Sequence, residues 1–455
     1  MINLFFEYNQ KSQDLERSLK AAGYQHPSVV IQDNGFLPDG VESPLRYFLR
    51  LAGSEFAGRP RYFNEIDLPK FWEIKADSQG GEVLDHGQKR ANIRYWKNNN
   101  LRQVSQVEWL DKFGQVRVID HYNQWGWKYA VTSCNKNGRQ AITGYFASNG
   151  QEVLIQNHLT GDYTYNLPNG KIYNFKNIDQ LTAYYLEEAD FDLDEVIFNS
   201  LGSCLFTLIQ LKKKPSHNIL FWQESNQGSV PENMLYLLKD NLPGSSVIIQ
   251  DRDEYKKITG QLNGQMAKKV NYLGIVYPFK RESQARKRAL ILTNSDNIEY
   301  LKQLVEGLPD WHFDIAAVTE MSSRLMSFGH YENVALYPVA RKKDVARLLE
   351  EDDLYLDINY ANEILQAGRQ AFENRLLILA FKDTLHSPEY VATENIFAAG
   401  DAAGMITTIK ELSDNKEYAR LLSLQEDHAG SETAEHFQEV LSKATNKSNV
   451  RMRQN

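Results

Sequence analysis

Short apolar runs separated by a segment of helical spacing open the chain. Residues 2–6 are mostly apolar, as are residues 28–31, and each run fits a short buried strand. Between them, residues 12–22 carry apolar side chains at helical spacing and end before Gly23, a residue type that commonly follows the last turn of a helix. This pattern predicts that the chain begins as an α/β domain.

A different pattern runs from about residue 67 to residue 187. Glycines recur every nine to twelve residues, at 114, 126, 138, 150, 161 and 170, and three of them follow an asparagine. Between the turns the residues alternate, so that Trp127, Tyr129 and Val131 share one face of a strand. Asn-Gly pairs suit two-residue hairpin turns because both residues tolerate positive φ. We therefore predict a long antiparallel meander.

The α/β pattern returns after residue 187. We expect a helix at 191–211 and strands at 218–222, 246–250 and 272–276, followed by a polar, basic linker at 278–288. Six further strands are predicted at 288–293, 313–318, 334–337, 354–358, 376–381 and 396–398. Helices lie between them, and helical segments follow from 413 to 445. Strands that alternate with helices favour a parallel sheet with right-handed crossovers.

These patterns divide the chain into five segments. Residues 1–66 and 188–282 are predicted to form a first Rossmann-like domain, and residues 67–187 an extended antiparallel β-sheet domain inserted into it. Residues 283–412 form a second Rossmann-like domain, and residues 413–455 form C-terminal helices and a tail. The predicted fold class is α/β and GT-B-like, with two Rossmann-type domains. Ligands of such sheets bind at the carboxyl ends of the strands.

Composition and charge argue against several classes of protein. The net charge is −8 and the basic residues are spread along the chain, whereas a nucleic-acid-binding surface needs a basic patch. Cys134 and Cys204 fall in different predicted domains, so we expect no disulfide, and two cysteines cannot form a structural zinc site. The start lacks the features of a signal peptide, and no run reaches the roughly 18 apolar residues of a membrane span. We expect a cytoplasmic protein without a metal or cofactor.

The helix expected after Ile358 corresponds to a known donor site. In retaining glycosyltransferases of the GT-B fold, two glutamates eight residues apart hold the donor sugar there. Matched by the following strand, these positions carry Asn362 and Gln370, whose amides form hydrogen bonds but have no charge. A shift by one residue would place Glu363 first and Ala371 second, so no shift restores the pair. The alternative is that Asn362 is only a helix N-cap and Gln370 a surface residue.

Two loops that should approach a diphosphate also lack the expected residues. The loop after the first strand, residues 7–11, contains no glycine. The loop after the first strand of the second domain reads Asn-Ser-Asp-Asn where a Gly-Arg turn is usual, and we expect Ser295 or Asp296 to cap a helix that begins near Ile298. An acidic residue at that place would repel a diphosphate. We therefore predict a pseudo-enzyme without donor chemistry.

Two sets of residues are candidates for binding. Neutral side chains at the predicted cleft could hold an extended Ser/Thr-rich polypeptide through hydrogen bonds: Asn294, Asn362, Gln370 and His386. Aromatic side chains on the hairpin strands could form a partner-binding face if they are exposed: Trp127, Tyr129, Tyr163 and Tyr165. The alternatives are that the aromatic side chains cover a small core and that His386 is structural.

Nearly the whole chain resembles the accessory Sec system glycosylation chaperones of Gram-positive bacteria, the GtfB family. The resemblance is carried by the hairpin insert and by the segments MINLFFEYNQKSQDLERSLKAAGY, VIQDNGFLPDGVESPLRYF and ILAFKDTLH. It implies a non-catalytic subunit that stabilises a UDP-N-acetylglucosamine:peptide O-glycosyltransferase. That partner, a GT-B protein with intact glutamates, transfers N-acetylglucosamine to Ser and Thr of serine-rich repeat adhesins before export by the accessory Sec system.

The resemblance also implies where and with what the chain works. It implies that this subunit helps to hold the adhesin and pairs with the transferase through the hairpin domains in a heterotetramer. The complex would be a peripheral membrane protein at the cytoplasmic side of the cell membrane. Two alternatives stay open: a catalytically active GT-B glycosyltransferase that extends sugars on the same adhesin, and a stand-alone carbohydrate- or peptide-binding module.

Overall fold

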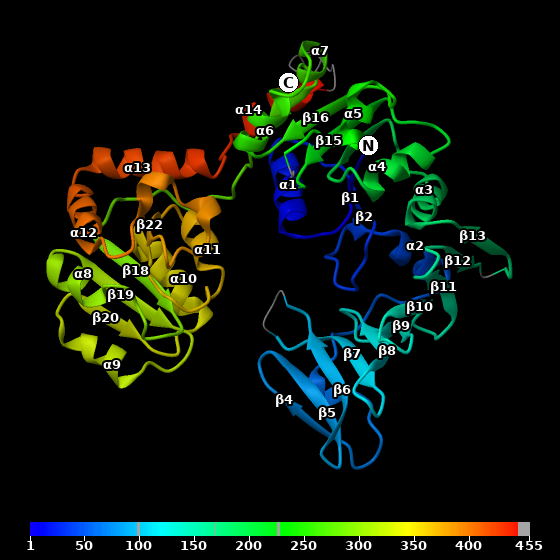
Figure 1. The fold of residues 1–455 in the computed structure, drawn as a ribbon, viewed down its shortest axis with the longest axis horizontal. Coiled ribbons are helices and arrows are strands. Elements are labelled where there is room, and N and C mark those ends of the chain that lie inside the picture. Colours follow the sequence, from blue (N-terminus) through cyan, green and yellow to red (C-terminus); the bar gives the residue numbers. More distant parts are fainter. Residues whose placement is uncertain (98–100, 168, 225–227, 445–455) are drawn as a thin grey trace. The chain divides into compact units, whose positions relative to one another are not determined.

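The computed structural model describes residues 1–97, 101–167, 169–224 and 228–444. The chain divides into two compact units (Figure 1). The first contains residues 1–272 together with the chain from residue 438 onward, and the second contains residues 273–437. Each unit is built around its own parallel sheet, and the first also carries a large antiparallel sheet.

The parallel sheet of the first unit has seven described strands in the order β17-β16-β15-β14-β1-β2-β3. Its strands are β1 (Ile2–Phe5), β2 (Ser28–Val30), β3 (Val41–Glu42), β14 (Glu195–Phe198), β15 (His217–Trp222), β16 (Ser245–Ile249) and β17 (Val270–Tyr272). The helices are α1 (Gln10–Ala21), α2 (Pro44–Leu51), α3 (Ile178–Glu188), α4 (Ser203–Gln210), α5 (Glu232–Leu238), α6 (Arg252–Thr259) and α7 (Gly264–Ala267). Because β1 pairs with β14, chain from both sides of the insertion builds one sheet.

The helix predicted at 191–211 is wrong in its first half. Residues Glu195–Phe198 form the central strand β14, and α4 begins only at Ser203. All four residues of β14 are buried. After Glu195 its residues are all apolar, as is typical of a strand buried on both faces, so there is no alternation to distinguish it from a buried helix.

The inserted sheet has ten described strands in sequence order, which confirms the predicted antiparallel meander. Its strands are β4 (Glu73–Ala76), β5 (Gly80–Asp85), β6 (Gln88–Tyr95), β7 (Val104–Leu110), β8 (Val116–Tyr122), β9 (Lys128–Cys134), β10 (Gln140–Phe146), β11 (Glu152–Asn157), β12 (Tyr163–Asn166) and β13 (Ile172–Phe175). The three Asn-Gly turns are not of the predicted two-residue type, because none of their asparagines has a positive φ. In the turn after β9, Gly138 has φ +73° but Asn137 has no positive φ, and the N–H of Gly138 donates to the carbonyl of Asn135 (2.9 Å). This is a longer turn with the glycine in the left-handed position.

The second unit has a six-stranded parallel sheet in the order β20-β19-β18-β21-β22-β23. Its strands are β18 (Arg288–Thr293), β19 (His312–Ala317), β20 (Val334–Tyr337), β21 (Leu354–Asp357), β22 (Leu377–Phe381) and β23 (Ile396–Phe397). Its helices are α8 (Leu301–Gly307), α9 (Ser323–Met326), α10 (Lys342–Glu351), α11 (Ala367–Glu373), α12 (Ala402–Glu411) and α13 (Asn415–His428), with α14 (Ala434–Ala444) following them. The two parallel sheets and the antiparallel insertion confirm the predicted fold class.

One hydrophobic core joins the inserted sheet to the first α/β domain. Val29 of β2 and Phe48 of α2 belong to the same buried cluster as Leu154 and Tyr165 of the inserted sheet. The rings of Phe48 and Tyr165 lie 4.3 Å apart between centroids. Each such side chain contributes about 1.5–3 kcal/mol when it is fully buried, so the sheet and the domain stabilise each other.

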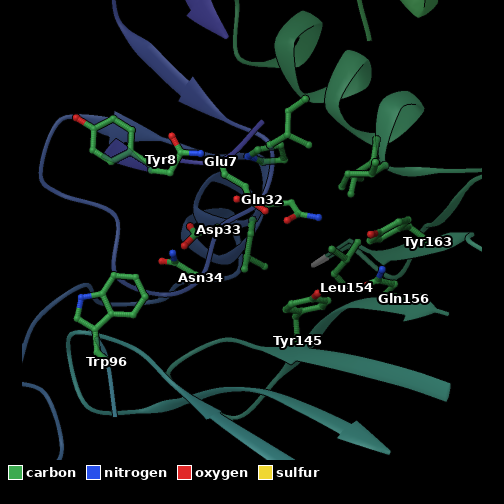
Figure 2. Close-up of a pocket in the computed structure, with 16 residues that line it drawn as sticks. Glu7, Tyr8, Gln32, Asp33, Asn34, Trp96, Tyr145, Leu154, Gln156 and Tyr163 are labelled. Carbon is green, nitrogen blue, oxygen red and sulfur yellow. Dashed lines mark hydrogen bonds between the residues drawn. The ribbon is translucent and has the colours of Figure 1, made fainter. Parts of the chain in front are cut away.

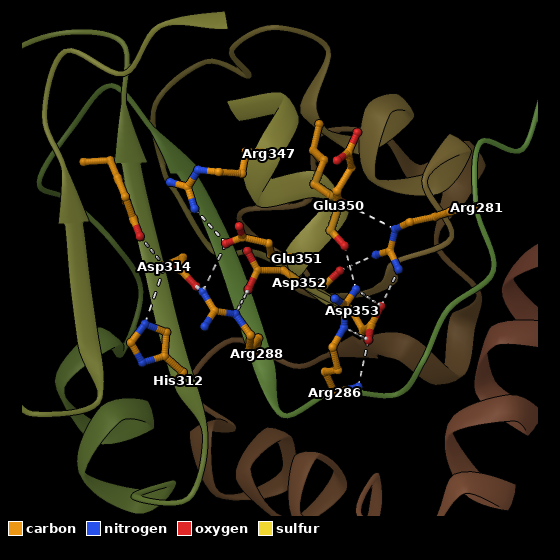
Figure 3. A network of polar contacts seen from close by, with 12 residues as sticks. Arg281, Arg286, Arg288, His312, Asp314, Arg347, Glu350, Glu351, Asp352 and Asp353 are labelled. Carbon is orange, nitrogen blue, oxygen red and sulfur yellow. Dashed lines mark hydrogen bonds and ion pairs between the residues drawn. The ribbon is translucent and has the colours of Figure 1, made fainter. Parts of the chain in front are cut away.

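Buried charges fix the amino ends of three strands in the second unit (Figure 3). Arg288 pairs with Asp314 (2.6 Å) and Asp352 (3.2 Å), while Arg281 and Arg286 pair with Asp353 (2.6 and 2.8 Å). All three aspartate side chains are 0% exposed. The two neighbouring aspartates differ in charge. Burial, and then Asp314, raise the pKa of Asp352 well above its ordinary value.

Asp353 behaves in the opposite way. Burial works against its ionisation, but hydrogen bonds from Arg286 and Arg281 outweigh burial and lower its pKa. At neutral pH the second unit therefore contains an ionised Asp353 beside a protonated Asp352. Protonation of Asp352 removes the repulsion between its buried carboxylate and that of Asp314.

We predict that Asp352→Asn changes the pH dependence of stability. The native state holds a proton on Asp352 that the unfolded chain loses near pH 4, so this residue's contribution to stability falls as pH rises from about 4 toward the raised native pKa. The variant lacks this titration. Its free energy of unfolding, measured in urea relative to the wild type, should improve from pH 5 to pH 8 by at most about 1.4 kcal/mol per pH unit.

Asp353→Asn is the matched control for this prediction. It removes an ionised carboxylate with two arginine partners and should cost about 3–5 kcal/mol at pH 7. Parallel pH profiles for Asp352→Asn and the wild type would contradict the assignment of the proton.

Candidate functional site

The carboxyl ends of β18, β21 and β22 meet at one edge of the second unit's sheet. Thr293, the last residue of β18, donates from Oγ1 to Oδ1 of Asn359 in the loop after β21 (3.0 Å). This hydrogen bond ties the two loops together. Asn294 and Asn362, two of the residues predicted at this edge, lie on these loops with exposed side chains.

His386 lies in the loop after β22 and joins it to the loop after β21. Its Nδ1 lies 2.6 Å from Oδ1 of Asp357, and its Nε2 lies 2.7 Å from the carbonyl oxygen of Ala361. A carboxylate and a carbonyl only accept hydrogen bonds, so both ring nitrogens donate and the ring is an imidazolium. The hydrogen bond with Asp357 raises the pKa of His386 despite its burial. This geometry agrees with the structural alternative for His386.

Helix α11 begins at Ala367, so Asn362 lies five residues before it and is not its N-cap. Glu363 occupies the helix start instead: its Oε1 accepts from the N–H of Gly368 (2.8 Å). Gln370 is half-buried, and its amide donates to a backbone carbonyl in the loop before the helix. The helix therefore has a carboxylate at its N-terminus, but that group serves the fold of the chain.

The prediction that Ser295 or Asp296 caps the next helix is wrong. Helix α8 begins at Leu301, and Tyr300 before it has a left-handed backbone (φ 47°) without a side-chain cap. The loop first pairs with the loop after β21, which delays the start of the helix. Asp296 accepts from Oγ of Ser322 (2.9 Å) and adds negative charge to this edge.

The glycine-free loop after β1 is also used by the fold. The side chain of Asn9 accepts from the N–H of Ser12 (3.1 Å) and caps α1. Tyr8 donates to Glu16 (2.5 Å), which also accepts from Ser28 (2.6 Å). Burial, followed by the hydrogen bond to Glu16, raises the pKa of Tyr8. The loop is thus held by side chains that a phosphate-binding glycine turn would lack.

A groove lies in the first unit, between the loops that follow β1 and β2 and the inserted sheet. It consists of two adjoining cavities of about 480 and 940 Å³. Figure 2 shows the smaller one, with Glu7, Gln32 and Asp33 on the side of the α/β domain and Tyr145 and Gln156 on the side of the inserted sheet. Six residues line both cavities: Gln32, Asp33, Asn34, Trp96, Tyr145 and Gln156.

The loop after β2 forms one wall of the groove and is held rigidly. Buried Arg46 donates to three backbone carbonyls of residues 37–41 and lies 3.5 Å from Asp33. The carbonyl of Gly35 accepts from the N–H of Gln124 in the turn after β8 (2.9 Å). Gly35 has φ +84°, and a Cβ there would lie 2.8 Å from the ring of Tyr129. Glycine at this position therefore allows the close approach of the two walls.

The aromatic residues predicted for partner binding lie mainly in the core. Tyr129, Tyr163 and Tyr165 are buried, and Trp127 packs half-buried against the same cluster. This placement agrees with the alternative that these side chains cover a core. Other residues of the inserted sheet are exposed and could still contact a partner. A role of this sheet in partner binding therefore stays a prediction.

Sequence reasoning missed the groove and a row of polar residues on its floor: Gln106, His121, Thr132, Thr143 and His158. These residues lie on successive strands or just after them, and they share one face of the sheet. The pairing register shifts between His121 and Tyr122 and again between Gln140 and Ile142. A bulge shifts which residues face the same side of the sheet. The alternation of residues along the sequence therefore does not predict that these five side chains share a face.

Among the described residues, no group of three or more His, Cys, Asp or Glu side chains is placed to hold a metal ion. None of the described helices combines the length and the apolar character that crossing a membrane requires.

Four family models match the chain. They are described as the GtfB N-terminal domain (residues 2–48), the GtfB middle domain (72–176), the GtfB third domain (179–261) and the GftB/GlyA-F C-terminal domain (289–425). A curated relative from Streptococcus gordonii is 42% identical over 97% of this chain and 98% of the relative. Another, from Streptococcus agalactiae, is 40% identical over 97% of this chain and 99% of the relative. Both are named UDP-N-acetylglucosamine–peptide N-acetylglucosaminyltransferase stabilizing protein GtfB.

Solved structures give the same result. A chain in a crystal structure of a GtfA/B complex bound to UDP and GlcNAc superposes with a TM-score of 0.89 at 40% identity, covering 97% of this chain and 99% of that one. A chain from accessory secretory proteins 1, 2 and 3 of Streptococcus pneumoniae superposes with a TM-score of 0.63 at 12% identity, covering 98% and 99% of the two chains. This second likeness concerns the fold alone.

We predict that His386→Gln lowers stability in a pH-dependent way. The folded-state pKa of His386 is raised, so its stabilising effect is fully present below the unfolded value of about 6.5 and is lost as pH rises through the folded value. The variant should lose about 1–2 kcal/mol of unfolding free energy at pH 6, and less at pH 9, in urea denaturation.

His436→Gln provides a matched control. His436 also lies 2.7 Å from a carboxylate, Glu432, but its side chain is 48% exposed, so its loss should cost under about 1 kcal/mol. An equal cost of His386→Gln at pH 6 and pH 9 would contradict the imidazolium assignment.

Proposed function

The chain belongs to the GtfB family of N-acetylglucosaminyltransferase-stabilising proteins, and we propose that it is the non-catalytic subunit of such a transferase complex. In this role it stabilises a partner UDP-N-acetylglucosamine-dependent transferase and binds the acceptor polypeptide. The acceptor is a Ser/Thr-rich chain of the serine-rich repeat adhesin class, modified before export by the accessory Sec system. A heterotetramer at the cytoplasmic face of the membrane is part of the same proposal and is supported by the family resemblance.

The non-catalytic role is supported by the use that the fold makes of each donor-site position. Asn9 caps α1 where a glycine turn would approach a phosphate, and Asp296 adds negative charge after β18. Glu363 is engaged at the start of α11 and His386 is paired with Asp357. The one cation among these groups, the His386 imidazolium, is neutralised by Asp357, so positive charge for a diphosphate leaving group would have to come from elsewhere.

Acceptor binding is supported by one observation above the others, the groove beside the inserted sheet. Its shared lining combines three amides, two aromatic rings (Trp96 and Tyr145) and Asp33, whose charge is paired with Arg46. The ring of Trp96 stacks on Phe36 (4.7 Å between centroids, 6° between planes), so it is held in place before a ligand arrives. Neutral donors and acceptors beside fixed aromatic rings suit an uncharged, extended polypeptide. Asn294 and Asn362, both exposed, remain candidates for additional contacts.

We expect the purified chain alone to transfer no sugar. Incubation with UDP-N-acetylglucosamine and a Ser/Thr-rich peptide should leave the peptide mass unchanged, and adding the partner transferase should produce glycosylated peptide. The double variant Asn362→Glu/Gln370→Glu should remain inactive alone, because the loops that approach the phosphates are also altered. Transfer by the chain alone at the rate of the complex would instead favour an active glycosyltransferase.

We also expect Trp96→Ala to weaken peptide binding. Loss of a buried aromatic contact at a binding site costs about 2 kcal/mol, or roughly 30-fold in Kd, in a fluorescence anisotropy titration with the same peptide. Phe113→Ala is the control, because Phe113 is 77% exposed at the tip of a hairpin and does not line either cavity. Equal loss in both variants would place the acceptor outside the groove.

A further inference from the structure

The floor of the larger cavity carries an unbroken row of hydrogen-bonded side chains. An amide nitrogen of Gln106 lies 3.3 Å from Nδ1 of His121, and Nε2 of His121 lies 2.8 Å from the hydroxyl of Thr132. That hydroxyl lies 2.7 Å from the hydroxyl of Thr143, which lies 2.7 Å from Nε2 of His158. The row crosses from β7 to the end of β11, a distance of about 19 Å at the usual strand spacing.

The number of N–H and O–H hydrogens in the row limits the directions that its hydrogen bonds can take. A neutral imidazole has one N–H and one acceptor nitrogen, and each threonine hydroxyl has one hydrogen. Thr132 and Thr143 are nearly inaccessible to solvent, 1% and 4% exposed, so their hydroxyl groups have to find partners within the protein. The four hydrogen bonds are therefore satisfied together only when all of them run in the same direction.

Two arrangements meet this condition. In the first, the hydrogens point from Gln106 toward His158: His121 carries its hydrogen on Nε2 and His158 carries it on Nδ1, which can donate to a ligand. In the second, the amide of Gln106 is rotated and every bond is reversed, so His121 carries its hydrogen on Nδ1 and His158 on Nε2. The Nδ1 of His158 is then an acceptor. A mixed arrangement leaves a buried hydroxyl hydrogen unsatisfied or places two hydroxyl oxygens together without a hydrogen between them.

The row is uncharged at neutral pH. Burial lowers the pKa of His121 to about 4 and lowers that of His158 as well. The charged groups around the row are largely paired: Arg94 with Glu108 (3.1 Å), and Asp33 with Arg46 (3.5 Å). Asp120, next to His121, is paired with Lys128 (3.3 Å), and Lys97 lies at the margin of the cavity.

We propose that this row is a hydroxyl-recognition element that can reverse its polarity and so couples the two ends of the groove. The inference rests on the proposed acceptor binding and names the chemical group that the groove reads. A hydroxyl both donates and accepts, so it can match either polarity at His158, whereas a carboxylate only accepts and an ammonium only donates. The hydroxyl can belong to Ser or Thr of a polypeptide or to a sugar that the polypeptide carries.

The length of the row sets the size of the ligand. At about 3.3 Å per residue, an extended polypeptide needs about six residues to reach from Gln106 to His158. The row links its two ends: the direction of the hydrogen bond at Gln106 decides whether Nδ1 of His158 donates or accepts. Ligand hydroxyl groups near both ends can match either arrangement, because each hydroxyl can donate or accept.

The first test reads the tautomers of the free protein. With the histidines labelled with ¹⁵N, the nitrogen shifts at pH 7.5 report which ring nitrogen carries the hydrogen. We expect His121 and His158 to hold opposite tautomers, Nε2–H with Nδ1–H or the reverse, with mixed pairs below about a tenth of the population. Thr143→Val should remove this correlation, and Ser133→Ala, on the exposed part of the neighbouring strand, should keep it. Uncorrelated tautomers in the wild type would overturn the row as a coupled unit.

The second test uses three peptides of about twelve residues on the full chain. They are a Ser/Thr-rich peptide, the same peptide with Ser and Thr replaced by Ala and Val, and the Ser/Thr peptide carrying N-acetylglucosamine. We expect at least about tenfold weaker binding of the Ala/Val peptide, and tautomer shifts at both histidines with the hydroxyl-bearing peptides. Thr143→Val should confine the shift to one histidine. Tighter binding of the sugar-bearing peptide than of the bare one would identify sugar hydroxyls as the group read, and the reverse would identify Ser and Thr.

The outcomes separate the two proposals. Equal binding of the Ser/Thr and Ala/Val peptides would overturn hydroxyl recognition but leave acceptor binding in place. Failure of all three peptides to bind would overturn the proposed acceptor binding, and hydroxyl recognition with it, whatever the tautomers of the free protein.

Discussion

The groove depends on a single buried cation, Arg46. Its guanidinium donates to backbone carbonyls of the loop after β2, pairs with Asp33 and lies 5.1 Å from the centroid of the Trp125 ring. These contacts fix the loop on one side and reach the turn after β8 on the other. Removing one partner of a buried ion pair typically costs about 3–5 kcal/mol, because the remaining charge is left without compensation. The contacts of Arg46 are therefore costly to break, and they hold the walls of the groove in place.

Polar side chains are also used by the fold at the carboxyl edge of the second unit's sheet, where a donor would bind. Side chains that another protein could direct at a nucleotide sugar are here directed at the chain itself, as helix caps and as a clamp between loops. Near the groove, Asp33 and Glu108 are paired with arginines, and most of the other polar groups that line it are neutral. A surface of this kind gains little from attraction over long distances and depends on the fit of short-range hydrogen bonds.

The sequence allowed the fold class and the family to be predicted, because both rest on patterns that span many residues. Local interpretation failed where burial removed the pattern. Residues Glu195–Phe198 are buried on all sides and had no alternation to indicate a strand. Asn362 was expected at a helix start, but pairing between two loops moved both neighbouring helices downstream. The groove could not be predicted at all, since bulges in β8 and β10 decide which polar side chains share a face.

The pairing of β1 with β14 has a consequence for how the chain folds. Ile2 lies opposite Val196, so the central strands of the first parallel sheet are separated by about 190 residues of sequence. At synthesis rates of about 5–20 residues per second, β2 can pair with β1 early, but β14, the neighbour on the other side, follows roughly 10–40 s after β1. During that time the insertion, whose hairpins form from local contacts, can fold first. One edge of β1 lacks its partner strand during that time, and the inserted sheet, which shares a hydrophobic core with Ile2 and Leu4 of β1, can cover its apolar side chains.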